Sequence, residues 1–163
     1  MRLLLLPALV AVTAAGRTDK TVQARKLRVL VDADLTSWQA WNDFAMEFAE
    51  ATGARVMHID DGGIAGSAFH DRALRLKAPV LMSPKRYTDT LPARLRKLPV
   101  VDPCPLWCWS LVTRADDDRE TIATLREHAS TVAQTAGLHT VPAGPTWLPA
   151  SDPHRDEITP PPA

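Results

Sequence analysis

Residues 27–63 read LRVLVDADLTSWQAWNDFAMEFAEATGARVMHIDDGG, and this stretch decides the fold class. Leu27–Val31 is a short apolar run rich in β-branched residues, which predicts a buried strand. Over Trp38–Ala49 apolar side chains recur at helical spacing, and Gly53 predicts the end of that helix. Ala54–Ile59 predicts the next strand. A strand, a helix and a second strand joined by short connections are typical of parallel α/β winding.

The same alternation continues toward the C-terminus. A helix is predicted over Ile64–Lys77, and a third strand over Pro79–Met82. Two further strands are predicted over Leu98–Val101 and Leu106–Thr113, and an amphipathic helix over residues 122–137. We therefore expect an α/β fold in which helices flank a mostly parallel sheet.

The composition is that of an ordinary folded domain. Of 163 residues, 45% are hydrophobic, and 19 basic side chains balance 19 acidic ones. A zero net charge argues against a dedicated nucleic-acid binder, which needs a basic surplus to meet phosphate. Two cysteines cannot form a disulfide scaffold, and without a CxxC pattern they predict no metal site. No apolar run reaches the roughly 18–20 residues that a membrane span requires.

The N-terminal residues allow two interpretations. Arg2, the apolar stretch Leu3–Val12 and the small residues up to Gly16 outline a secretory signal peptide. Alternatively, Ala8–Thr13 is a buried strand. These residues alone do not choose between the two.

Proline dominates the C-terminal end. Seven of the fourteen prolines fall between Pro142 and Pro162, and proline removes backbone donors and favours extended geometry. We therefore expect an ordered domain over residues 1–137 and a flexible, proline-rich tail over residues 138–163.

Polar residues gather where the predicted parallel strands end, and in an open α/β sheet ligands bind at that edge. Thr36, followed three residues later by Gln39, predicts a capping box at the start of the first helix. The hydroxyls and N–H groups of such a helix start can receive a polar ligand, whereas the nearby Asp32 and Asp34 disfavour a strongly anionic one. The polar residues at this edge are Asp32, Asp34, Thr36, Ser37, Asp60, Asp61, Gly62, Gly63 and Ser83.

One interpretation of this edge is enzymatic. Residues 32–36, DADLT, directly follow an apolar strand and resemble the first motif of haloacid-dehalogenase-type phosphatases. The resemblance implies that Asp32 is a nucleophile, that Asp34 is an acid–base group and that Mg²⁺ lies nearby. In that family the Ser/Thr and Lys motifs precede the final acidic pair, whereas Ser83 and Lys85 follow the acidic pair here. A small magnesium-dependent phosphatase is therefore the enzyme alternative.

A second resemblance covers residues 9 to about 128. They look like the later part of a LysR-type transcriptional regulator, namely the second lobe of its effector-binding domain and the segment that returns to the first lobe. LPVVDPCPLWCWSLVTR at 98–114, before an acidic turn and a closing helix, carries most of this similarity. LVAVTAAG at 9–16 resembles the family's crossover strand, TVQARKL at 21–27 the segment before the second lobe, and VLMSP at 80–84 a lobe strand.

This resemblance implies a type II periplasmic-binding-protein-like lobe, in a family whose two α/β lobes clasp a small molecule between them. It implies a non-enzymatic effector-binding domain that lacks the helix-turn-helix, does not bind DNA by itself, needs no cofactor or membrane and can form a homodimer. Residues 1–15 are then a crossover strand in a cytoplasmic protein. If they are instead a signal peptide, a small secreted α/β protein is the second alternative. The implied effector-binding residues are Thr36, Ser37, Trp38, Asp60, Gly62 and Ser83.

Overall fold

A computed structural model describes residues 2–84, 90–114, 116–138 and 140–158. Its main sheet has six strands in the order β3-β7-β2-β6-β4-β5. Strand β2 runs antiparallel to both of its neighbours, and the other pairs are parallel. The prediction of a mostly parallel sheet is therefore confirmed. The strands are β3 Val22–Gln23, β7 Leu95–Val101, β2 Val10–Ala14, β6 Val80–Leu81, β4 Arg28–Asp32 and β5 Arg55–Ile59.

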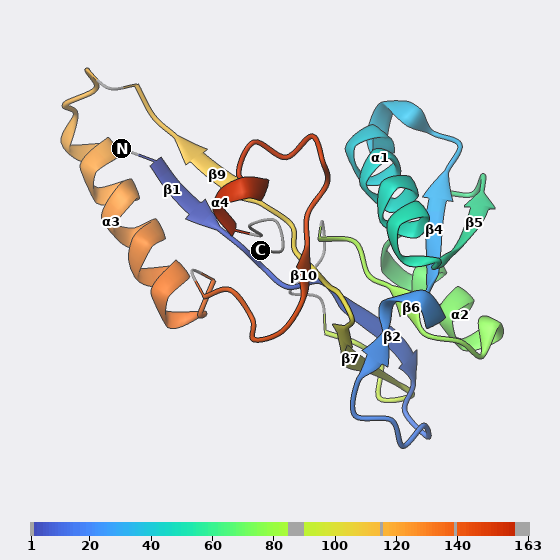
Figure 1. Cartoon of the computed structure of the whole chain (residues 1–163). Helices are drawn as coiled ribbons and strands as arrows, with labels where there is room; N and C mark the ends of the chain where they lie inside the picture. Colours follow the sequence, from blue (N-terminus) through green and yellow to red (C-terminus); the bar gives the residue numbers. More distant parts are fainter. Residues whose placement is uncertain (1, 85–89, 115, 139, 159–163) are drawn as a thin grey trace.

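Two helices flank this sheet (Figure 1). Helix α1, Leu35–Thr52, packs on β4 and β5, and helix α2, Gly66–Leu76, packs on β2. Gly53 closes α1 with a φ of 76°, a left-handed conformation that glycine adopts without strain. A one-turn 3-10 helix, Ala24–Lys26, precedes β4. The core is built from the inward faces of these strands and helices, and Phe48 on α1 is among its largest fully buried side chains.

Strand β2 occupies the residues for which two interpretations were open. It lies between β7 and β6, and its Ala11 and Val12 side chains are completely buried. Val10–Ala14 thus form the inner strand that the strand interpretation predicts, shifted slightly from Ala8–Thr13. Among the described residues, no helix is long and apolar enough to cross a membrane.

A smaller unit lies beside the main sheet (Figure 1). Strand β1, Arg2–Leu5, pairs antiparallel with β9, Trp109–Val112, and helix α3, Glu120–Thr135, packs against β1. Two of the passes that the chain makes between the units follow β1 and precede β9. The two passes run side by side: Leu9 N–H donates to the Pro105 carbonyl at 2.8 Å, and Trp107 N–H donates to the Pro7 carbonyl at 3.1 Å.

The C-terminal segment, residues 140–158, differs from the expected flexible tail. Strand β10, Thr146–Trp147, pairs parallel with β8, Cys104–Pro105, and a short helix α4, Arg155–Ile158, follows. The Trp147 ring lies 5.1 Å from Phe48, centroid to centroid, and Leu148 is buried. Prolines limit regular pairing here, but these two apolar side chains hold the segment against the molecule. Residues 139 and 159–163 of the predicted tail lie outside the described residues.

Candidate ligand-binding site

The carboxyl ends of the parallel strands meet at one edge of the main sheet, as the sequence predicts. Asp32, the last residue of β4, pairs in register with Ile59, the last residue of β5, and Ala33 N–H donates to the Ile59 carbonyl at 2.9 Å. Met82, directly after β6, donates its N–H to the Val10 carbonyl at 2.9 Å, which places the end of β6 beside the start of β2. This edge therefore lies where the chain enters the main sheet from the smaller unit.

Asp32 is held rigidly at this edge. Its backbone N–H donates to Asn42 Oδ1 at 3.0 Å, and Asn42 Nδ2 donates back to the Asp32 carbonyl at 2.7 Å. Its carboxylate Oδ1 accepts from Asp34 N–H at 2.8 Å. Asp32 is only 5% exposed, and its Oδ2 has no hydrogen-bond partner among the described residues. Because an unsatisfied buried acceptor costs about 1–3 kcal/mol, this oxygen is a point where a donor from a ligand or water would gain most.

The start of α1 is capped by Asp34, so the prediction that Thr36 caps this helix is wrong. Asp34 Oδ1 accepts the N–H groups of Thr36 at 3.0 Å and Ser37 at 3.2 Å. Aspartate caps a helix as well as threonine does, and a cap at Asp34 includes Leu35 in the first turn. The Asp34 carboxylate thus accepts hydrogen bonds from two backbone N–H groups that were expected to be available to a ligand. A polar ligand here meets the hydroxyls of Thr36 and Ser37, which are exposed.

The other predicted site residues differ in their surroundings. Trp38 is half-buried against the core, and Asp60 and Gly62 are exposed in the turn after β5. Gly62 has a φ of 66°, which favours glycine at that position. Ser83 is buried and lines a small cavity beside the start of α2, which none of the other five residues lines. The assignment of these six residues to one effector site stays a prediction.

A turn beside this edge is fixed by an ion pair. Asp61 accepts the Gly63 N–H at 3.0 Å and binds Arg72 of α2 at 2.5 Å. The Gly63 hydrogen bond, together with the charge of Arg72, lowers the pKa of the Asp61 carboxyl below its usual value. The carboxylate of Asp61 thus stabilises the turn that carries Asp60 and Gly62.

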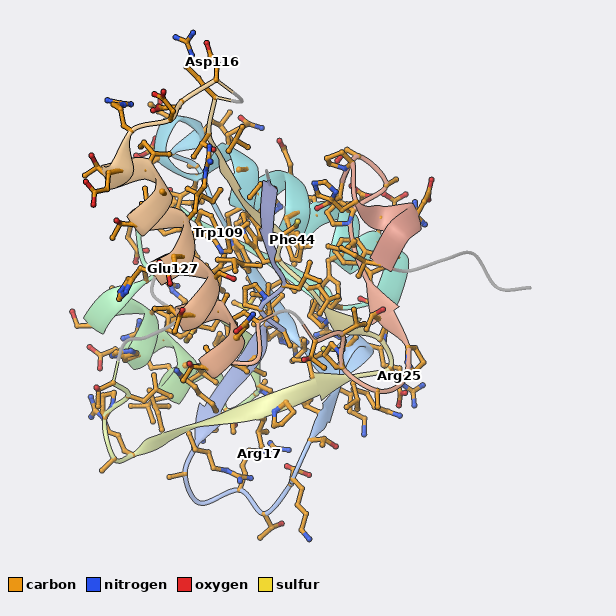
Figure 2. All side chains as sticks on the ribbon, turned by 90° about the vertical axis from the view of Figure 1, so that its left-hand side faces the viewer. Arg17, Arg25, Phe44, Trp109, Asp116 and Glu127 are labelled. Carbon is orange, nitrogen blue, oxygen red and sulfur yellow. The ribbon has the colours of Figure 1, made fainter. Side chains whose placement is uncertain are left out.

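A pocket of about 260 Å³ lies between α1, the second pass between the units and the C-terminal segment. On α1 it is lined by Asp43, Phe44 and Glu47, and from the C-terminal segment by Asp152. Phe44, which belongs to α1, is labelled in Figure 2. The sequence does not indicate this pocket, because one of its walls is the segment predicted to be a tail. A Trp and a Leu among the prolines, at 147 and 148, were the only signal that this segment packs.

The two cysteines differ in their surroundings. Cys104 is buried beside Leu106 and Leu148, and that burial raises the pKa of its thiol. Cys108 is partly exposed and lines the pocket, where its sulfur lies near Asp152 and His154. This group of thiol, carboxylate and imidazole is the set of described residues best suited to hold a metal ion.

Cys104 should therefore resist alkylation in the folded protein. A raised pKa keeps its thiol protonated at neutral pH, and the protonated form is not nucleophilic. After treatment of the native chain with iodoacetamide at pH 7.5, peptide mass spectrometry should find Cys104 unmodified. The same treatment in urea should modify it. Equal labelling in both conditions would contradict the buried position of this thiol.

The fold is similar to that of the reduced form of the OxyR regulatory domain from Pseudomonas aeruginosa. The match has a TM-score of 0.51 at 10% sequence identity, and it covers 82% of this chain and 66% of that chain. The chain thus spans just under two thirds of that structure. The regulatory domain has the type II periplasmic-binding-protein-like fold, so the predicted fold class is confirmed. No family model matches the sequence, and no curated protein matches it.

Proposed function

We propose that this chain is a small-molecule effector-binding domain of the LysR type. The observation that carries the proposal is the fold, which is similar to a regulatory domain over 82% of the chain. The sequence at 98–114 supports it independently, because it resembles the same region of LysR-type regulators. In this function the chain binds an effector, catalyses no reaction and, as domains of this type often do, forms a homodimer.

The effector site that we propose is the carboxyl edge of the main sheet. Asp32 is the centre of this site, because its buried Oδ2 is an acceptor without a protein partner. Asp34 adds a second carboxylate and already accepts the N–H groups of Thr36 and Ser37. An anionic ligand would therefore meet negative charge and few donors. The favoured effector is neutral or cationic and presents an ammonium, guanidinium or hydroxyl group to Asp32.

The proposal also concerns location and DNA. A zero net charge supports a domain that does not itself bind DNA, since the basic surplus that phosphate requires is missing. We place the protein in the cytoplasm, where regulators act. The secreted alternative is not favoured, because cleavage near Ala14 or Ala15 would remove β2 from within the sheet. The phosphatase alternative is not favoured either, because the similar fold is that of a regulatory domain.

Ligand binding at Asp32 tests the proposal. A panel of amines, guanidines, polyols and carboxylates would be screened with the full chain by thermal shift, and each ligand found measured by calorimetry. Asp32→Asn keeps an oxygen for the Asp34 N–H but places an amide donor at the second position. We expect it to weaken binding about 10–100-fold, because hydrogen bonds to charged groups contribute about 1.5–3 kcal/mol.

The matched control is Asp116→Asn. Asp116 is exposed and pairs with Arg114 at 3.1 Å in the turn before α3 (Figure 2), so this variant should bind as the unmodified chain does. Equal affinity in Asp32→Asn and the unmodified chain would contradict the proposed site. Hydrolysis of p-nitrophenyl phosphate with Mg²⁺ that is lost in Asp32→Asn would contradict the proposed function itself.

A further inference from the structure

A group of three side chains of different chemistry lies beside the pocket on α1. The sulfur of Cys108, a carboxylate oxygen of Asp152 and a ring nitrogen of His154 all lie within 4.8 Å of one another. Cys108 comes from the second pass between the units, and Asp152 and His154 come from the turn before α4. His154 is 3% exposed, and the other two are partly buried. These residues are far apart in the chain, so only the packing of the C-terminal segment brings them together.

We propose that Cys108, Asp152 and His154 bind a divalent transition-metal ion, with Zn²⁺ the best fit. A thiolate, an imidazole and a carboxylate are the three protein ligands that Zn²⁺ takes. With bonds of about 2.0–2.3 Å, tetrahedral Zn²⁺ separates its ligand atoms by about 3.5 Å. The three atoms lie within 4.8 Å of one another, so they need to approach by at most about 1.3 Å. Binding replaces the proton of the Cys108 thiol with the metal and releases that proton to solvent.

The turn that carries two of the ligands is already ordered. His154 N–H donates to Asp152 Oδ1 at 2.8 Å, which orients that carboxylate as an outer-shell hydrogen bond orients a metal ligand. Asp152 N–H donates to the Pro149 carbonyl at 3.1 Å, and Arg155 N–H donates to the Asp152 carbonyl at 3.1 Å. Because the turn is already ordered, it loses little conformational entropy when the ion binds.

The charge around the group also favours a cation. Cys108 and Asp152 line the pocket together with Asp43 and Glu47 of α1. Among the described residues that line this pocket, none is a lysine or an arginine. Three protein ligands leave a fourth position beside the pocket, where water or a small anionic ligand can complete the tetrahedron. This site is separate from Asp32, so the inference does not rest on the proposed effector site.

Cobalt binding tests the proposal with a spectroscopic signal. The full chain, reduced and freed of metal by a chelator, would be titrated with Co²⁺ and then with Zn²⁺. We expect one Co²⁺ per chain, a sulfur-to-cobalt charge-transfer band in the near ultraviolet and visible bands typical of tetrahedral Co²⁺. Zn²⁺ should remove these bands by displacement. A chain that gives no charge-transfer band at stoichiometric Co²⁺ would overturn the proposal.

The variants separate this site from other metal binding. Cys108→Ser should lose the charge-transfer band, whereas the matched control Cys104→Ser, four positions earlier, should keep it. Asp152→Asn and His154→Gln should each weaken Zn²⁺ binding at least about tenfold, measured by competition with a chromophoric chelator. Circular dichroism would establish that each variant is folded. A band that persists in Cys108→Ser, or a Zn²⁺ affinity unchanged in folded Asp152→Asn, would overturn the assignment.

Discussion

Replacing Val12 by aspartate should leave the chain unfolded at neutral pH. Val12 is completely buried in β2, where it pairs in register with Lys97 of β7 on one side and Val80 of β6 on the other. Because Val12 is completely buried, a carboxylate at this position loses its hydration, and burying such a charge costs several kcal/mol. That cost is comparable with the total stability of a domain, about 5–15 kcal/mol.

The matched control for this variant is Val112→Asp. Val112 lies in β9 of the smaller unit and is 76% exposed, so the same substitution there leaves the carboxylate in water. Circular dichroism should show a cooperative thermal transition for Val112→Asp and none for Val12→Asp. A Val12→Asp chain that melts within a few degrees of the unmodified protein would show that β2 is not an inner strand.

Replacing Phe48 by alanine should lower the free energy of unfolding by about 3–5 kcal/mol, the usual range for a buried phenylalanine. The Phe48 side chain is completely buried on α1, stacked on Phe44 with ring centroids 6.3 Å apart and edge-on to Trp147 at 5.1 Å. Its removal leaves a cavity between the helix and the C-terminal segment. Urea unfolding, followed by circular dichroism, would measure the loss.

Met46→Ala is the control on the same helix. Met46 is 47% exposed, so its truncation should change the free energy of unfolding by about 0.5 kcal/mol or less. Similar losses for the two variants would contradict the packing of the C-terminal segment on α1. A loss for Phe48→Ala below about 1 kcal/mol would do the same.

Local patterns predicted the main sheet well. The stretch 27–63 gave a strand, a helix and a strand whose bounds agree with β4, α1 and β5 to within about a turn, because each carries its own apolar period. The helix cap was harder. Asp34 and Thr36 are both good N-cap residues two positions apart, and only the backbone conformation at Asp34 decides between them.

Non-local packing could not be predicted from the same patterns. The many prolines at the C-terminal end led to the prediction of a flexible tail. Trp147 and Leu148 pack that segment against α1 and β8, which lie far away in the chain. The group of Cys108, Asp152 and His154 was missed for the same reason, since no ligand spacing connects residues from two separate segments. The resemblance of residues 98–114 to LysR-type regulators supplied the fold family, which periodicity alone does not specify.

The paired connections between the two units determine how those units can move. Across the two passes, Leu9 N–H donates to the Pro105 carbonyl and Trp107 N–H donates to the Pro7 carbonyl. Ala8 bridges to Leu106, and β10 adds a third segment beside β8. A hydrogen-bonded ribbon resists sliding along its length far more than it resists bending or twisting. Sliding of one pass along the other would therefore break these hydrogen bonds. Because β10 pairs with β8, loss of the C-terminal segment would remove one of the three chain segments that lie together between the units.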